Sequence, residues 1–133
     1  MNQSPPLAWT GVPDGTLSFA VSLYDRTEMN THWIMWDIPA TERMLPGMLA
    51  GGTMPAFPPG SSQKAAFAGT NNGYRGPGAA GVNTYEIELW ALRVAKLPAA
   101  TAGQPLNTII GTVLPANRIA SVKITAKGTM GGL

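Results

Sequence analysis

Two neighbouring segments of this chain have the residue patterns of β-strands, and they constrain the fold more than any other feature. Residues 17–25 (LSFAVSLYD) alternate between larger apolar side chains and smaller or polar ones. Because successive side chains of a strand point to opposite faces, this alternation predicts a half-buried strand. Residues 32–40 (HWIMWDIPA) form a continuous apolar run that ends near Pro39, which predicts a central strand buried on both faces. Residues 26–31 would connect the two strands.

The second half of the chain adds two strands and a helix to this prediction. Residues 85–94 alternate as a third strand, and residues 119–127 read as a final strand. Between them, the apolar residues of 105–114 recur at the three- and four-residue spacing of an amphipathic helix that Pro115 would end. We therefore expect a mainly β fold with a short helix in its C-terminal half.

Composition supports one packed domain with long turns. The 133 residues suit a single domain over 1–133, and the hydrophobic share of 44% argues for a real core despite 16 glycines and 12 prolines. A long irregular region separates Pro39 from Tyr85. Loops longer than about 15 residues in compact domains tend to be functional.

Several classes of site and partner are excluded by what the chain lacks. Without cysteine there is no disulfide, no thiolate zinc site and no cysteine nucleophile. No dinucleotide, Walker-type or serine-hydrolase motif occurs, so we expect no cofactor and no metal. A net charge of +2 from scattered residues argues against nucleic acid, and no apolar run is long enough for a membrane span. No signal peptide is visible, which favours the cytoplasm but leaves the compartment open.

His32 is the only histidine, and it opens the apolar segment, while Asp25 ends the preceding strand. If the connection folds back, these two side chains lie at the same end of neighbouring strands. One interpretation is a structural hydrogen bond between them. The other is an anion-binding corner or an acid/base pair, with His32 and Asp25 as candidate catalytic residues.

Three ordered motifs resemble the phosphatidylethanolamine-binding protein family, whose members are also called Raf kinase inhibitor-like proteins. Residues 2–25 (NQSPPLAWTGVPDGTLSFAVSLYD) resemble its opening motif, and residues 32–40 resemble its H-W-V-V-x-N-I-P-A segment. Residues 73–92 (GYRGPGAAGVNTYEIELWAL) resemble its G-Y-x-G-P…G-x-H-R-Y-x-F-x-L-Y-A-L block. The resemblance covers most of the chain and implies an antiparallel β-sandwich with a small anion-binding pocket at one end.

The resemblance also implies which residues form that pocket. Asp25 matches the first Asp of the family's Asp-Pro-Asp-Ala-Pro loop, and His32 matches the histidine of H-W. Gly76 and Pro77 match the Gly-Pro turn, and Tyr85 matches the tyrosine of H-R-Y. In the family this pocket takes phosphate, acetate or the phosphoryl group of a lipid headgroup.

This chain departs from the family pattern at several positions. In the loop, the second Asp is Thr27 and both prolines are absent, with Arg26 and Met29 in their places. The histidine and arginine of H-R-Y are Asn83 and Thr84, and the Trp before the H-W histidine is Thr31. An amide can donate to a phosphate but carries no positive charge, so the sequence predicts a modified anion pocket. Asn83 becomes the sixth predicted ligand-binding residue.

Three functions remain open from the sequence. The first is a binding or regulatory module for a small anionic or polar ligand. The second is an acid/base enzyme, an isomerase or cyclase, with His32 as acid/base, Asp25 orienting it, and Asn83 and Tyr85 as polarising donors. The third is a degenerate structural chain paired with another.

The family normally carries further residues, forming one or two strands, ahead of the motif that begins here at Asn2. An uncovered strand edge invites pairing. We therefore expect a chain that is part of a larger protein, or a homo- or hetero-oligomer that covers the N-terminal edge.

Overall fold

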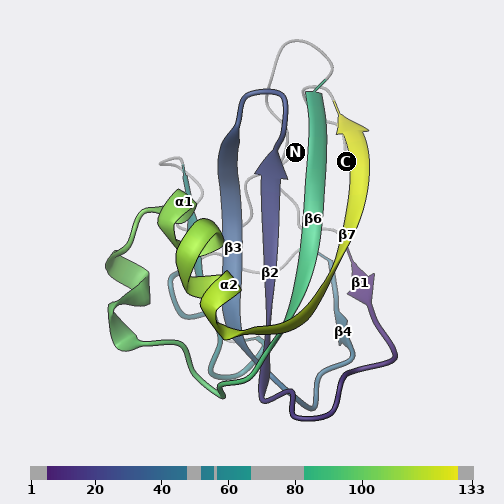
Figure 1. Cartoon of the computed structure of the whole chain (residues 1–133), viewed down its shortest axis with the longest axis vertical. Coiled ribbons are helices and arrows are strands. Elements are labelled where there is room, and N and C mark those ends of the chain that lie inside the picture. The colour runs from purple at the N-terminus through teal and green to yellow at the C-terminus, as the bar shows by residue number, and fades with distance from the viewer. Residues whose placement is uncertain (1–5, 48–51, 56, 67–82, 129–133) are drawn as a thin grey trace.

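A five-stranded antiparallel sheet forms the centre of the molecule in the computed structural model, which describes residues 6–47, 52–55, 57–66 and 83–128, with side chains as far as Ile124. The strand order in this sheet is β5-β3-β2-β6-β7. The strands are β5 (Ser62–Ala65), β3 (Asn30–Pro39), β2 (Ser18–Asp25), β6 (Asn83–Leu92) and β7 (Arg118–Gly128). A smaller antiparallel sheet pairs β1 (Leu7–Ala8) with β4 (Met44–Leu45) (Figure 1).

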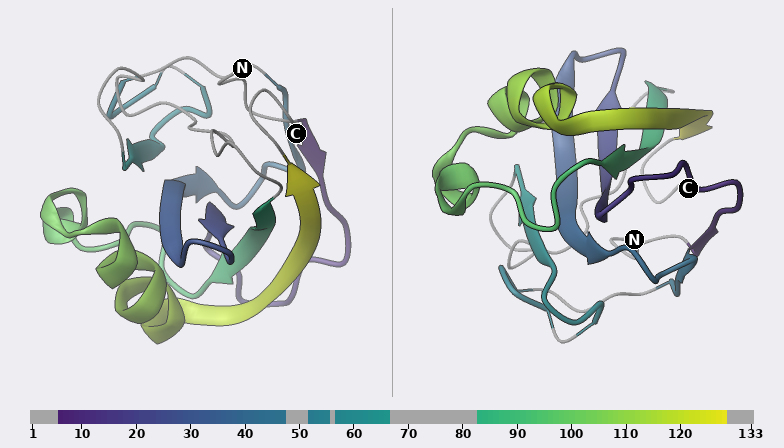
Figure 2. Two further views of the ribbon diagram at one scale, coloured as in Figure 1. Left: turned by 90° about the horizontal axis from the view of Figure 1, so that it is seen from above. Right: turned by 60° about the horizontal axis from the view of Figure 1, so that its bottom comes forward.

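The large sheet is covered on both faces. A helical segment lies on one side of it, and β1 and β4 lie on the other (Figure 2). One apolar cluster joins Phe19, Val21 and Leu23 of β2 to Leu45 of β4. The other joins Ala20 and residues of β3 and β6 to the helical segment. The prediction of a mainly β, antiparallel fold with one short helix is confirmed.

Burial of β2 differs from the sequence prediction. The alternation predicted a half-buried strand, but β2 is buried on both faces and occupies the middle of the sheet. Its small polar residues are buried because each has a partner: the Ser18 hydroxyl donates to the Val94 carbonyl (2.6 Å), and the Ser22 hydroxyl accepts from the Trp90 indole (3.1 Å). A buried hydroxyl costs little when it is hydrogen-bonded. The strand β3 is buried on both faces, as predicted.

The predicted helix is present and runs two residues past Pro115. It consists of α1 (Leu106–Thr108), the π-helical segment η2 (Ile109–Val113) and α2 (Leu114–Asn117). Pro105 is the residue immediately before its first helical residue, Leu106. A preceding 3₁₀ turn, η1 (Ala99–Gly103), was not predicted. None of the helical segments in the described ranges has the length and apolar character needed to span a bilayer.

Strands β4 and β5 lie inside the region that the sequence pattern left irregular. β5 pairs with β3, with Ser62 opposite Trp36 and Ala65 opposite Trp33. Its residues, SQKA, have no apolar alternation, so nothing in the local pattern marks a strand. Instead, buried Gln63 accepts a hydrogen bond from the Trp33 indole (3.0 Å) and donates to the Gly52 carbonyl (2.9 Å).

Candidate functional site

Strand pairing brings the predicted site residues to one end of the large sheet. Asp25, the last residue of β2, lies opposite Tyr85 of β6 and opposite Asn30, the first residue of β3. Residues 26–29 form the turn between β2 and β3, so the connection is shorter than the predicted 26–31. His32 follows two residues into β3, and Asn83 begins β6.

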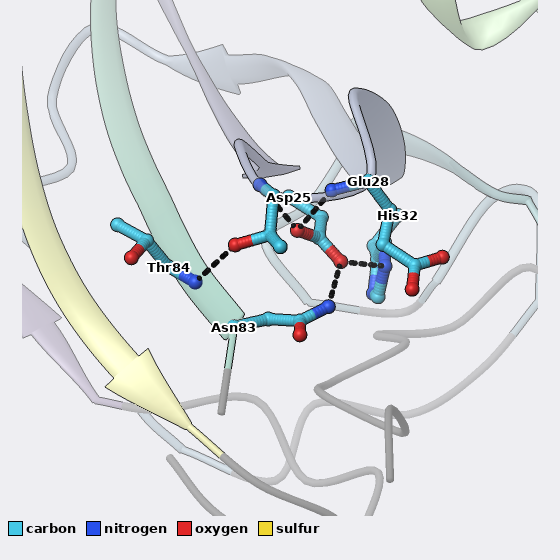
Figure 3. A network of polar contacts seen from close by, with 6 residues as sticks. Asp25, Glu28, His32, Asn83 and Thr84 are labelled. Carbon is cyan, nitrogen blue, oxygen red and sulfur yellow. Dashed lines mark hydrogen bonds and ion pairs between the residues drawn. The ribbon is translucent and has the colours of Figure 1, made fainter. Parts of the chain in front are cut away.

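The Asp25 carboxylate organises this end of the sheet (Figure 3). Its Oδ1 accepts hydrogen bonds from the backbone amides of Thr27 (2.9 Å) and Glu28 (3.0 Å). Its Oδ2 accepts from the side-chain amide of Asn83 (2.9 Å) and lies 3.7 Å from His32 Nε2. Both interpretations of the Asp25–His32 pair required the two groups to be close, and the structure places them so.

The residues that make these contacts are buried, which strengthens the hydrogen bonds between them. Asp25, His32 and Asn83 are 2%, 6% and 5% exposed, and Tyr85 is fully buried. The Tyr85 ring meets the His32 ring edge-on, with centroids 5.5 Å apart and an interplanar angle of 75°. This burial favours a single arrangement of the side chains. If the Asp25 carboxylate lost one of its hydrogen-bond donors, no water molecule could easily take the donor's place.

Thr27, one of the residues that depart from the family motifs, helps to hold the turn between β2 and β3 in place. The Thr27 hydroxyl accepts from the Thr84 backbone amide (2.9 Å), and the Arg26 backbone amide donates to the Thr84 carbonyl (2.8 Å). Thr27 therefore ties the β2–β3 turn to β6. The motif comparison marked Thr27 only as a lost carboxylate, and no pattern in the sequence signalled this bond.

Thr31 lies away from the site. Its hydroxyl donates to the Asn107 side-chain oxygen (2.6 Å) at the start of the helix. His32, the next residue along the strand, contacts Asp25 and Tyr85 on the opposite face, at the point where the register between β2 and β3 shifts. The change at position 31 therefore acts on the contact with the helix rather than on the Asp25 cluster.

The chemical groups presented here are one carboxylate, one imidazole and one amide. Asn83 uses one N–H on Asp25, and its carbonyl oxygen has no hydrogen bond to any described residue. An amide in this position can therefore both accept and donate one further hydrogen bond. Arg26 directs its guanidinium to Glu86 (3.7 Å) instead of to Asp25.

The predicted Gly76–Pro77 wall lies outside the described residues. Within those residues, no three His, Asp or Glu side chains gather closely enough to hold a metal ion. The described part of the site is therefore the group Asp25, His32, Asn83 and Tyr85.

Comparison with known proteins gives a consistent answer along nearly the whole chain. The family model described as phosphatidylethanolamine-binding protein matches residues 1–127. The UPF0098 protein YbcL of Escherichia coli is 36% identical over 93% of this chain and 70% of its own length. The UPF0098 protein YbhB of Escherichia coli is 31% identical over 94% of this chain and 80% of its own length.

Solved structures agree with the sequence comparison. The crystal structure of Escherichia coli YbcL, described as a new member of the mammalian PEBP family, matches with a TM-score of 0.70 and 31% identity. That match covers 97% of this chain and 81% of YbcL. The phosphatidylethanolamine-binding protein homologue CT736 of Chlamydia trachomatis matches with a TM-score of 0.67 at 17% identity, over 94% of this chain and 80% of CT736, and supports the fold alone.

Proposed function

The chain belongs to the phosphatidylethanolamine-binding protein family, and we propose that it is a binding or regulatory module for a small anionic or polar ligand. The proposed site is the group Asp25, His32, Asn83 and Tyr85. The observation that carries the proposal is the position of Asp25 Oδ2 between the Asn83 amide (2.9 Å) and the His32 imidazole (3.7 Å). A carboxylate in this position orients both neighbours toward a shared ligand.

The modified residues favour a ligand of lower charge than phosphate. The family motif has a histidine where this chain has Asn83, and a neutral amide makes weaker hydrogen bonds to an anion than a charged donor does. The family's second Asp is Thr27, whose hydroxyl already binds the Thr84 amide. A monoanion such as a carboxylate, or a neutral polar group, suits the remaining donors and acceptors best.

Titration followed by NMR tests this proposal directly. His32 is the only histidine, so its ring-proton signals are unambiguous. Acetate and inorganic phosphate serve as probes at constant pH and ionic strength. We expect acetate to shift the His32 signals in a saturable way at lower concentration than phosphate.

A variant that restores the family's histidine tests the ligand preference, and a histidine placed elsewhere serves as its control. In Asn83→His, phosphate binding should tighten by roughly tenfold, the scale of one charge-assisted hydrogen bond. Thr112→His adds a histidine at an exposed position of the helix and should leave phosphate binding unchanged. If neither probe binds the natural chain or Asn83→His, the site is vestigial and the structural alternative holds.

Acid/base catalysis at His32 is the second candidate, and the nearby Asp25 carboxylate favours it. A buried carboxylate beside an imidazole holds the ring in a defined orientation, as general acid/base catalysis requires. The test is whether a ligand that binds this site is converted, followed by NMR of the ligand itself. His32→Gln should abolish conversion, and conversion that persists in His32→Gln excludes this role.

Association at the N-terminal side is a further part of the proposal. Val122 and Ile124 of β7 are 59% and 55% exposed and line a hollow with Leu7 and Trp9. β7 is an edge strand in the described sheet, and exposed apolar edges favour pairing. We expect a second copy of the chain to cover this edge. Light scattering after size exclusion should give the mass of a dimer for the natural chain. The Val122→Lys variant should give the mass of a monomer. A monomeric natural chain would contradict the expectation.

A further inference from the structure

A second pocket opens on the helix-covered face of the sheet, between the helical segment and strands β6 and β7. Its volume is about 410 Å³, which is ample for a small metabolite. The charged and aromatic side chains lining it are Tyr24, Glu86, Glu88, Trp90, Arg118 and Lys123. Glu86, Glu88 and Trp90 share this face because they alternate with Tyr85, Ile87 and Leu89 along β6. The pocket is thus on the opposite face from Tyr85.

Glu88 is the unusual member of this pocket. It is only 7% exposed, yet its carboxylate has no hydrogen bond or ion pair with any described residue. Lys123 lies directly opposite Glu88 in the β6–β7 register, but its ammonium lies 3.9 Å from Glu86. On the other side, the Ser22 hydroxyl accepts the Trp90 indole N–H. The residue is largely enclosed while its carboxylate still reaches the surface of the pocket, so an ammonium group bound there would gain a charge-assisted hydrogen bond.

Arg118 supplies the complementary charge at the rim. Its guanidinium lies 5.9 Å from the centre of the Trp90 ring and has no ion pair with a described residue. Glu86 is neutralised from two sides, by Arg26 (3.7 Å) and Lys123 (3.9 Å). Among the described residues that line the pocket, one carboxylate and one guanidinium therefore have no ion pair, either with each other or with another residue.

We propose that this pocket binds a small zwitterion, with its ammonium group on Glu88 and its anionic group on Arg118. The Trp90 and Tyr24 rings would flank the ligand's carbon chain, and aromatic faces also attract an ammonium. A ligand of this kind satisfies both unpaired charges at once, whereas a simple cation or anion satisfies only one.

Calorimetric titration with unbranched amino acids tests the charge separation. The probes are glycine, β-alanine, 4-aminobutyrate and 6-aminohexanoate, with phosphoethanolamine to distinguish a phosphoryl from a carboxylate anion. Butylamine and butyrate each carry only one of the two charges. We expect one chain length to bind best and to bind at least tenfold more tightly than butylamine or butyrate.

Isosteric variants assign the two charges. Glu88→Gln should weaken the best zwitterion about tenfold or more and leave butyrate binding unchanged, and Arg118→Gln should weaken the zwitterion but not butylamine. Glu42→Gln removes a carboxylate outside the pocket and should bind like the natural chain. Circular dichroism and thermal melting confirm that each variant is folded.

Two outcomes overturn the proposal: no zwitterion binds, or Glu88→Gln binds it as tightly as the natural chain does. Butylamine binding equal to that of the best zwitterion also overturns it, since the site would then recognise a cation alone. Acetate binding followed at His32 reports the other site independently, so failure here leaves the Asp25 site unaffected.

Discussion

Asn83 donates from its side-chain amide to Asp25 Oδ2 over 2.9 Å, and this bond joins the first residue of β6 to the last residue of β2. Both residues are buried, so the bond has little competition from water. It therefore has two roles: it holds two neighbouring strands in register at their ends, and it orients the amide in the proposed site.

Removing this amide should destabilise the fold. Asn83→Ala leaves one oxygen of Asp25 without its donor, and the free energy of unfolding should fall by about 1–3 kcal/mol. Urea denaturation followed by tryptophan fluorescence measures the change. Asn117→Ala, which removes a hydrogen bond to the Val113 carbonyl at the end of the helix, should cost less because Asn117 is only half-buried. Equal losses in the two variants would count against a special role for Asn83.

The Thr27 hydroxyl should control local opening of the β2–β3 turn. Thr27→Val removes the acceptor for the Thr84 amide, and the expected cost is about 1 kcal/mol. Hydrogen exchange of the Thr84 amide should become faster, because this amide loses its hydrogen bond to the Thr27 hydroxyl. Thr27→Ser keeps the hydroxyl and should exchange like the natural chain. Unchanged exchange in Thr27→Val would show that the bond is not formed in solution.

Asp37 should make stability depend on pH. Burial raises the pKa of the Asp37 carboxyl above its ordinary value of 3.8, while the hydrogen bond from the Leu97 amide (2.8 Å) and the Lys96 charge lower it in part. Between 3.8 and the raised folded-state pKa, the folded state binds more protons than the unfolded state. Stability from this residue is therefore present below pH 3.8 and is lost as pH rises through the folded-state pKa.

Asp37→Asn tests this dependence without removing the acceptor for Leu97. Asn also tolerates the left-handed backbone of this position, where φ is 58°. As pH rises from 3.8, Asp37→Asn should gain stability relative to the natural chain, measured by thermal melting. Asp14→Asn, at an exposed position, is the control. A stability difference that does not vary with pH would contradict the assignment to Asp37.

Packing of the helix on the sheet should depend on Ile109. This residue is fully buried in the cluster formed with Ala20 and Trp36, so Ile109→Ala should lower the free energy of unfolding by about 2–5 kcal/mol. The neighbouring Ile110 is only half-buried, and Ile110→Ala should cost clearly less. Chemical denaturation of the two variants compares them directly. A larger loss for Ile110→Ala would mean that the helix packs on a different face.

Periodicity in the sequence predicted the four long strands and the helix, because each buries a continuous stripe or run of apolar side chains. Periodicity did not predict β1, β4 and β5, which are two, two and four residues long. Their pairing with distant strands is a property of the folded sheet, and so is the burial of Gln63. Periodicity also predicted that β2 is half-buried. The helix that covers its second face lies far away in the sequence, so the local pattern of β2 does not reveal it.

The three motifs, through their resemblance to the family, predicted that Asp25, His32, Asn83 and Tyr85 line one pocket, and strand pairing brings these residues to one end of the sheet. Only the tertiary structure decided how they are used: Asp25 is held by two backbone amides and Asn83, and Thr27 bonds to β6. The tertiary structure also decided that Lys123 lies close to the Glu86 carboxylate, although Glu88 is the residue directly opposite Lys123 in the strand register. Local pattern sets which face a side chain occupies, whereas its partner depends on strands brought together from far along the chain.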